Sequence, residues 1–293
     1  MISISDPHED RPLVSVIISS CNHAPYVEAS ILSVLEQSYP YIELLVIDDG
    51  SSDDSVARIQ ALQARRDFDF RVQTNKGLSR TLNDAIACAR GSLIAPFGSD
   101  DIMLPDRIAI QVAYMRDKPE VGICAGGIQV IDAAGRPRGK RCCPPARRLD
   151  FDDVFLNRKP GPPAPTLLFR REALERGGGF DPEIRLEDLA IELKITHAGY
   201  FIDVLENLLA LYRVHEKNTY KNHRFMMENI LRTYAYFDDH PDYAKVCANF
   251  RNSMLLKCAR QDKALARELL ANLPPSAWNL KTLRGLWRLL LPA

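Results

Sequence analysis

The sequence predicts an α/β fold, in which helices flank a mostly parallel sheet, followed by a helical extension at the C-terminus. Three observations support this fold class. Short apolar runs alternate with amphipathic stretches through residues 12–125, polar clusters follow several of these runs, and the pattern becomes wholly helical from about residue 222. We therefore expect an N-terminal tail of residues 1–11, an α/β domain of residues 12–220 and a helical extension of residues 221–293.

The first two strands are predicted from β-branched and other apolar runs at residues 14–19 and 42–47. Such continuous runs are typical of strands that are buried on both faces of a parallel sheet. Between them, residues 26–37 carry apolar side chains at helical spacing, and Pro40 ends the helix. The same alternation predicts strands at 71–73, 92–97 and 121–124, and helices at 55–64, 78–89 and 105–117.

The second half of the domain is less regular. Residues 136–148 are rich in Arg, Lys and Pro, which favours a solvated loop, and the prolines of residues 159–165 exclude regular structure there. Strands are predicted at 166–169, 201–205 and 209–213, and helices at 171–176 and 189–198. In the extension, the pattern predicts helices at 224–237, 243–260 and 263–273, and an amphipathic tail at 278–291.

Composition and charge exclude several classes of protein. The 293 residues include 38 Lys and Arg against 38 Asp and Glu, and 46% of the residues are hydrophobic. This balance argues against a nucleic-acid binder, which carries net positive charge, and against a disordered chain. No apolar run approaches the roughly 18 residues of a membrane span. The N-terminus lacks a signal-peptide pattern, and the seven cysteines show no CxxC spacing, so we expect a soluble cytoplasmic protein.

Polar clusters follow three of the predicted strands, at residues 19–22, 48–53 and 99–101. In a parallel sheet the carboxyl ends of the strands meet at one edge, where ligands bind. Each cluster alone is equally consistent with a turn, because Asp, Gly and Ser favour turns. The convergence of three clusters at one edge predicts a binding site.

Adjacent carboxylates at Asp100 and Asp101 indicate a site for a divalent cation. They follow a buried strand directly, and a Mg²⁺ or Mn²⁺ ion would relieve their repulsion while it binds substrate phosphates. Asp49, at the end of the second strand, is placed to accept hydrogen bonds from a base or a ribose. The glycine-rich phosphate loops of dehydrogenases and P-loop ATPases are absent. The sequence therefore favours a metal–diphosphate site.

The pair Glu187–Asp188 and the single residue His215 each have either a chemical or a structural role. Glu187 and Asp188 open a helical segment, where acidic side chains complement the helix dipole. The alternative is a carboxylate that acts as a general base toward an acceptor hydroxyl. His215 closes the last predicted strand, and a histidine there is either structural or a ligand for metal or phosphate.

Seven motifs occur in this order: residues 14–22, Asp48-Asp49-Gly50-Ser51, Asn75-Lys76-Gly77, Ser99-Asp100-Asp101, Gly178-Gly179-Phe180-Asp181, Glu187-Asp188 and Tyr212-Arg213-Val214-His215. Together they resemble the family 2 glycosyltransferases, inverting enzymes of the GT-A fold, of the type that builds bacterial cell-surface polysaccharides. The resemblance covers about residues 12–218 and implies a Rossmann-like αβα sandwich.

The resemblance implies a role for each matched position. Asp188 corresponds to the base that deprotonates the acceptor, and Asp101 and His215 correspond to metal ligands. The positions that correspond to nucleotide contacts are Ser19, Cys21, Asp49, Arg80, Asp100 and Arg213.

Three positions depart from the family pattern. The family commonly has an aromatic residue where this chain has Cys21, an Asp where it has Ser99 and an Arg where it has Leu82. The first departure weakens the expectation of base stacking. The last leaves a phosphate contact either missing or supplied by Arg80.

The implied reaction is a single displacement. The acceptor oxygen attacks C1 of a nucleotide-bound sugar while Asp188 takes its proton, and Mn²⁺ or Mg²⁺ together with Arg213 stabilises the leaving diphosphate. UDP-sugars are the commonest donors of the family, and the acceptor is a saccharide or a lipid-linked molecule. A sugar nucleotidyltransferase and an inactive domain that binds a sugar nucleotide or a partner are the alternatives.

The helical extension lies outside the resemblance. Its tail at 278–291 combines Trp and Leu residues with Lys281, Arg284 and Arg288. One interpretation is a packing helix or a homo-oligomer contact. The other is a helix that lies on a membrane surface, which would place the protein peripherally at the inner face of the membrane.

Overall fold

The computed structural model describes residues 11–143, 145–216 and 222–291. The chain divides into two compact units, which we call the α/β unit (Met1–Glu216) and the helical unit (Lys217–Ala293). Of the predicted tail at residues 1–11, only Arg11 is among the described residues, and the predicted boundary between residues 220 and 221 lies outside them.

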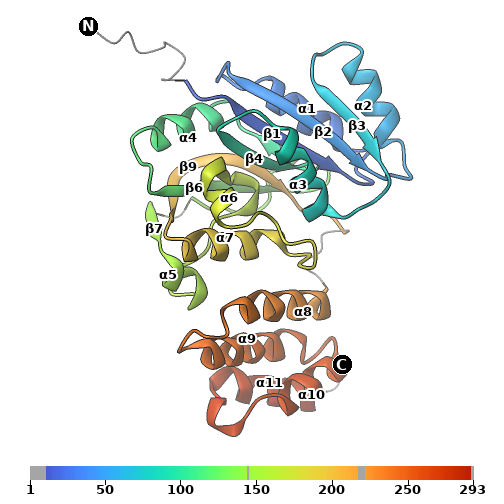
Figure 1. Ribbon diagram of the computed structural model, residues 1–293. Coiled ribbons are helices and arrows are strands. Elements are labelled where there is room, and N and C mark those ends of the chain that lie inside the picture. Colours follow the sequence, from blue (N-terminus) through green and yellow to red (C-terminus); the bar gives the residue numbers. More distant parts are fainter. Residues whose placement is uncertain (1–10, 144, 217–221, 292–293) are drawn as a thin grey trace, which may run out of the picture. The chain divides into compact units, whose positions relative to one another are not determined.

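The α/β unit is built on one nine-stranded sheet with the order β3-β2-β1-β4-β8-β6-β9-β5, and β7 pairs with β9 (Figure 1). Strands β1 to β4 form parallel pairs, as do β6 and β9, whereas the short strands β5, β7 and β8 pair antiparallel. The predicted mostly parallel sheet is therefore confirmed. The strands are β1 Val14–Ser20, β2 Ile42–Asp49, β3 Asp69–Gln73, β4 Leu93–Gly98, β5 Ile102–Met103, β6 Val121–Ile131, β7 Arg147–Leu149, β8 Leu168–Arg170 and β9 Phe201–Arg213.

Helices cover both faces of this sheet. Val14, Val16 and Ile18 of β1 join the core that α1, α2 and α4 form on one face. Ile17, between them, is equally buried but points to the opposite face, which α3, α6 and α7 cover. Helix α5 packs against α7. The helices are α1 Val27–Leu35, α2 Ser55–Gln63, α3 Leu78–Cys88, α4 Arg107–Met115, α5 Phe151–Phe155, α6 Arg171–Arg176 and α7 Glu187–His197, and a short 3₁₀ helix, η1, spans Ala164–Thr166.

The pairing of β6 with β9 differs from the sequence-based expectation. Residues 201–205 and 209–213 were expected as two strands, but they form the single strand β9, which pairs with β6 through several shifts of register. Glycines make this close pairing feasible, because a Cβ at Gly126 would lie 2.5 Å from Leu209 Cδ1. The expected loop at 136–148 is also partly ordered by this sheet, since Arg147 and Arg148 begin β7 and Cys142 bridges to β6.

The helical unit consists of four α-helices with short 3₁₀ segments, among the residues that the structure describes there. Helix α9 contacts α8, α10 and α11, and its residues Met254, Leu255 and Cys258 lie at the centre of the apolar core. In the described part of the chain, no helix combines the length and the apolar character that a membrane span requires. The elements are α8 His223–Tyr234, η3 Ala235–Phe237, α9 Tyr243–Cys258, α10 Lys263–Ala271, η4 Pro275–Ala277 and α11 Leu280–Leu290.

Candidate active site

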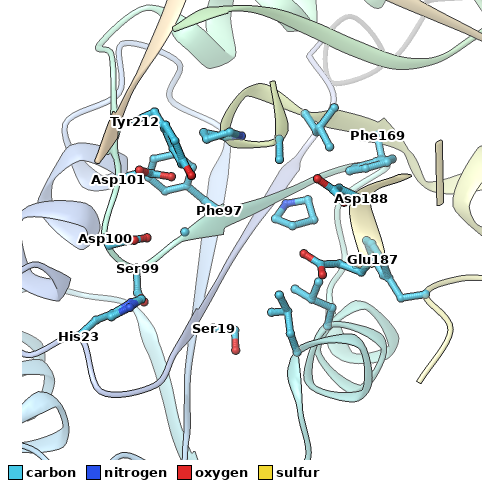
Figure 2. Close-up of a pocket in the computed structure, with 18 residues that line it drawn as sticks. Ser19, His23, Phe97, Ser99, Asp100, Asp101, Phe169, Glu187, Asp188 and Tyr212 are labelled. Carbon is cyan, nitrogen blue, oxygen red and sulfur yellow. The ribbon is translucent and has the colours of Figure 1, made fainter. Parts of the chain in front are cut away.

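A cavity of about 270 Å³ lies at the carboxyl ends of β1 and β4, where parallel sheets place their ligands. Acidic side chains line it on two opposite sides (Figure 2). We call one the strand side, because Asp100 and Asp101 lie two and three residues after the end of β4. We call the other the helix side, because Glu187 and Asp188 begin α7.

The strand side brings together ligands that suit a metal ion. Atoms of His23, Asp100 and His215 that can coordinate a metal all lie within 4.8 Å of one another. His215 Nε2 lies 2.9 Å from Asp100 Oδ2, and His23 Nδ1 lies 2.7 Å from Ser99 Oγ. Ser99 therefore orients His23. Two imidazoles and one carboxylate fit a divalent first-row metal, and imidazole is a softer ligand than Mg²⁺ prefers.

Asp101 lines the cavity but lies outside this ligand group. Its Oδ1 accepts a hydrogen bond of 2.8 Å from the backbone N–H of Arg213, and only 4% of its surface is exposed. Burial, followed by the charge of Asp100, raises the pKa of Asp101 well above its usual range. The structure thus groups Asp100 with His215, whereas the sequence-based assignment paired Asp101 with His215 as ligands.

Arg213 supports the turn that carries the two aspartates. Its Nε donates to the carbonyl oxygen of Asp100 at 2.7 Å, and its Nη1 donates to the carbonyl oxygens of Asp132 and Ala133 at 3.2 Å. The guanidinium carbon lies 4.8 Å above the ring of Tyr26. In this conformation the described contacts of Arg213 hold the strand side together, and Arg213 does not line the cavity.

Three of the residues expected at the nucleotide, Ser19, Cys21 and Asp49, lie at or next to the ends of β1 and β2. Ser19 lines it, whereas Asp49 and Cys21 lie next to the loop before α3. The Asp49 carboxylate accepts hydrogen bonds from the backbone N–H groups of Lys76 and Gly77 at 2.8 and 2.9 Å, and from the Gln73 amide at 2.8 Å. A carboxylate has about four acceptor positions, so one remains for a ligand.

Arg80 lies away from the cavity lining. Its side chain is 58% exposed, and its Nη2 lies 3.7 Å from Glu183 Oε1, which is also exposed. The neighbouring Leu82, at the position where the family commonly has Arg, is buried and lines the cavity. In this conformation Arg80 pairs with Glu183 outside the cavity lining, and its expected contact with a phosphate stays a prediction.

The helix side is a group of carboxyl groups in an apolar setting. Glu187 and Asp188 are partly exposed to the cavity, and Glu192, one turn further along α7, is only 5% exposed. Asp188 Oδ1 accepts a hydrogen bond of 2.8 Å from the backbone N–H of Leu189. Among the described residues, no Lys or Arg forms an ion pair with these three carboxyl groups.

Burial raises the pKa values of the carboxyl groups on the helix side. It raises the pKa of Asp188, and together with the charge of Asp188 it raises the pKa of Glu187 to about 8. The same two causes, burial first, raise the pKa of Glu192 well above its usual range. Burial therefore disfavours the charged form of all three carboxyl groups, and the charge of Asp188 disfavours it further at the two glutamates.

Two members of the site escaped the sequence analysis. His23 directly follows the polar cluster at residues 19–22, so its position after β1 was the available signal. Glu192 stands four residues after Asp188, which places both on one face of a helix. Neither residue type is informative without the fold.

Comparison with known proteins gives a consistent picture. The family model described as "Glycosyl transferase family 2" matches residues 15–178. The O-antigen biosynthesis glycosyltransferase WbnJ of Escherichia coli is 28% identical over 218 residues, which are 72% of this chain and 83% of the relative. A second E. coli protein, the UDP-Glc:alpha-D-GlcNAc-diphosphoundecaprenol beta-1,3-glucosyltransferase WfgD, is 36% identical over 126 residues, 42% of this chain and 48% of that protein.

A solved structure shares the fold. The crystal structure of S. aureus TarS 1–349 in complex with UDP-GlcNAc aligns with a TM-score of 0.66 over 90% of this chain and 82% of that chain, at 18% sequence identity. At this identity the likeness speaks for the fold alone. The predicted GT-A architecture with a C-terminal helical part is thereby confirmed.

Proposed function

We propose that this chain, which belongs to glycosyl transferase family 2, moves a sugar from a nucleoside diphosphate sugar to a hydroxyl group of an acceptor, with inversion at the anomeric carbon. One observation carries the proposal. One cavity is lined by His23 and Asp100, which with the adjacent His215 suit a cation, and on its helix side by Glu187 and Asp188, which form no ion pair among the described residues. The strand side is suited to bind a diphosphate through a cation, and the helix side is suited to accept a proton.

The donor end of the proposed reaction lies at the strand side. Ser19 at the end of β1 and the free acceptor position of Asp49 are the groups that would contact the base or ribose. A UDP-sugar is our choice of donor, because TarS, which shares the fold, has been solved with UDP-GlcNAc and WfgD is named for UDP-Glc. The backbone contacts of Arg213 would keep Asp100 in place while the diphosphate binds.

A divalent metal belongs to this proposal, and His23, Asp100 and His215 are the residues that would hold it. The bound ion would neutralise the negative charge that grows on the leaving diphosphate. Of Mn²⁺ and Mg²⁺, the two imidazole donors favour Mn²⁺. Asp101, which the sequence analysis proposed as a ligand, would instead hold the turn after β4 against β9, because its carboxylate accepts a hydrogen bond from the backbone N–H of Arg213.

The acceptor end lies at the helix side. Asp188 would accept the proton of the acceptor hydroxyl as the oxygen forms a bond to C1 of the sugar, and the bond from C1 to the diphosphate oxygen would break with its electron pair on the diphosphate. Burial and the charge of Asp188 raise the pKa of Glu187 to about 8 and the pKa of Glu192 well above its usual range, which disfavours the charged forms that would compete for the proton. Burial also raises the pKa of Asp188, and a raised carboxyl pKa suits a general base that works near neutral pH.

Other parts of the proposal rest on the relatives. The acceptor is a saccharide or a lipid-linked saccharide, because WbnJ is named for O-antigen biosynthesis and WfgD for a diphosphoundecaprenol acceptor. We assign transfer to residues 12–220 and treat residues 221–293 as an extension. The cytoplasmic location expected from the sequence stays a prediction.

The first experiment is a panel of nucleotide sugars with Mn²⁺, read by the release of nucleoside diphosphate and by product mass. We expect release from one UDP-sugar, loss of release with chelator, and loss with Asp188→Asn. Release of pyrophosphate from a sugar phosphate and a nucleoside triphosphate would instead identify a nucleotidyltransferase. Binding of a nucleotide sugar without any turnover, over a range of saccharide and lipid-linked acceptors, would contradict the proposal and identify a binding domain.

A further inference from the structure

We propose that helix α11 binds the surface of an anionic lipid bilayer. Five of the eight large hydrophobic side chains that are exposed in the described residues lie between residues 278 and 290. Four of them, at helical spacing, form a continuous stripe, which we call the outer stripe: Leu280 (70% exposed), Leu283 (56%), Trp287 (63%) and Leu290 (83%). Monomeric proteins rarely leave such a row in water unless it binds something.

The outer stripe is not needed to hold α11 in place. The opposite face of the helix packs on α9, where Gly285 comes so close that an added Cβ would lie 2.8 Å from Leu255 Cγ. On that same face the Thr282 hydroxyl donates to the buried side chain of Asn252, and Asn279 caps the helix. The helix is therefore anchored by one face and presents the other, as a surface-binding helix must.

The basic side chains beside the outer stripe indicate that its binding partner is anionic. Lys281, Arg284 and Arg288 form a second row beside the stripe, and no Asp or Glu follows Glu268. Lys281 and Arg288 use their donors on neutral partners, the Ser253 hydroxyl and the Leu256 carbonyl, and no Asp or Glu of the described residues forms an ion pair with either. An apolar row flanked by basic side chains is the pattern of a helix that lies in the headgroup region of anionic lipid.

The charge of the whole helical unit points the same way. Residues 217–293 contain 13 Lys and Arg against 6 Asp and Glu, a net charge of +7, whereas residues 1–216 contain 25 against 32, a net charge of −7. A second copy of the chain placed against α11 through its own α11 would bring two strongly positive units together, which disfavours that contact. A negative lipid surface attracts the unit instead.

The test is flotation of the full chain with vesicles. We expect the chain to float with vesicles that contain phosphatidylglycerol, to float much less with phosphatidylcholine alone, and to detach as salt is raised. Replacing Leu283→Ser together with Trp287→Ser should lower the floated fraction by about tenfold. Val72→Ser, an exposed apolar residue on β3 of the α/β unit, is the matched control and should leave flotation unchanged. Circular dichroism and melting curves check that each variant is folded.

Three outcomes would overturn the proposal. The first is no flotation with any vesicle. The second is equal flotation of the wild type and the double variant. The third is a dimer in light scattering that the double variant loses, which would identify a second copy as the occupant. Arg284→Glu sharpens the result, because it should weaken binding to anionic vesicles only. Release of nucleoside diphosphate in the absence of lipid should stay unchanged in the double variant, so this test stands apart from that of the proposed function.

Discussion

The two sides of the cavity contain the same kind of side chain in opposite surroundings. On the strand side, Asp100 and Asp101 lie among His23, His215 and Arg213, so negative charge is met by groups that can carry positive charge or share a cation. On the helix side, the described residues offer Glu187, Asp188 and Glu192 no cation within ion-pair distance. The neighbours of a carboxylate thus decide whether it is suited to bind a cation or to accept a proton.

A buried arginine strengthens the contrast. Arg107 of α4 is fully buried, donates to Gln111 and to the Leu167 carbonyl, and lies 5.3 Å over the ring of Phe97 at the cavity wall. Burial lowers its pKa to about 9, which still leaves it charged at neutral pH. Its charge favours the ionised form of Asp101. The carboxyl groups of the strand side therefore lie near a buried positive charge, whereas those of the helix side lie in apolar surroundings.

The largest effect is expected from Asp188→Asn, which removes the proton acceptor but keeps its shape. We expect kcat to fall by about 10²–10⁴-fold, since general-base catalysis contributes that much, while the affinity for donor stays within twofold. Steady-state transfer and calorimetric titration with the nucleotide measure the two quantities, and the exposed Asp117→Asn is the control. Full transfer by Asp188→Asn together with loss in Glu187→Gln would move the base to the neighbouring residue.

The next effect separates the two aspartates of the strand side. Asp100→Asn should weaken Mn²⁺ binding by about 10–100-fold, because it removes a ligand oxygen that faces His215. Asp101→Asn should weaken it less, because Asp101 faces the backbone of Arg213. Titration of Mn²⁺ into each variant, followed by paramagnetic relaxation of water protons, compares them. A larger loss in Asp101→Asn would favour the ligand assignment made from the sequence.

A smaller effect concerns stability against pH and tests the helix side. Glu187 has an ordinary pKa of 4.5 and a folded pKa of about 8. Between these values the folded chain binds a proton that the unfolded chain has released, so the free energy of unfolding falls as the pH rises from about 4.5 to 8. Glu187→Gln should remove this part of the decline and raise the melting temperature at pH 8 by a few degrees. Exposed Glu175→Gln is the control, and equal pH profiles for both variants would contradict the raised pKa of Glu187.

The smallest effect is expected from Arg80→Gln. Arg80 pairs with Glu183 at 3.7 Å, and both side chains are mostly exposed, so the pair contributes little to stability. Because Arg80 does not line the cavity and its exposed ion pair is weak, we expect the KM for donor to change by less than about twofold. A tenfold rise in KM without a change in melting temperature would show that Arg80 reaches the donor during the reaction, and the sequence-based role would be right.

Much of the α/β unit could be predicted from local patterns. A strand buried on both faces is a continuous apolar run, and β1 and β2 are such runs. Strands β5 and β7 could not be predicted in the same way, because they have two and three residues and form only where β9 offers them a partner. Their sequences carry no periodic signal of their own.

The candidate site was predictable only in part, for a related reason. The strand ends placed Asp100 and Asp101 at one edge of the sheet, and the family resemblance implied a role for Asp188. The orientation of each carboxylate depends on partners far along the chain, because His23 meets Ser99 across 76 residues and His215 meets Asp100 across 115. Such contacts decide which of the two neighbouring aspartates faces His215, and no local sequence pattern encodes them.

The opposite charges of the two units have a consequence for the behaviour of the purified chain. At pH 7 the chain as a whole is neutral, so no net repulsion keeps molecules apart. The helical unit of one molecule, at +7, will attract the α/β unit of another, at −7, and this attraction is strongest at low ionic strength. Solubility should therefore pass through a minimum near neutral pH and rise when salt is added, in contrast to a protein whose neutrality is spread evenly over its surface.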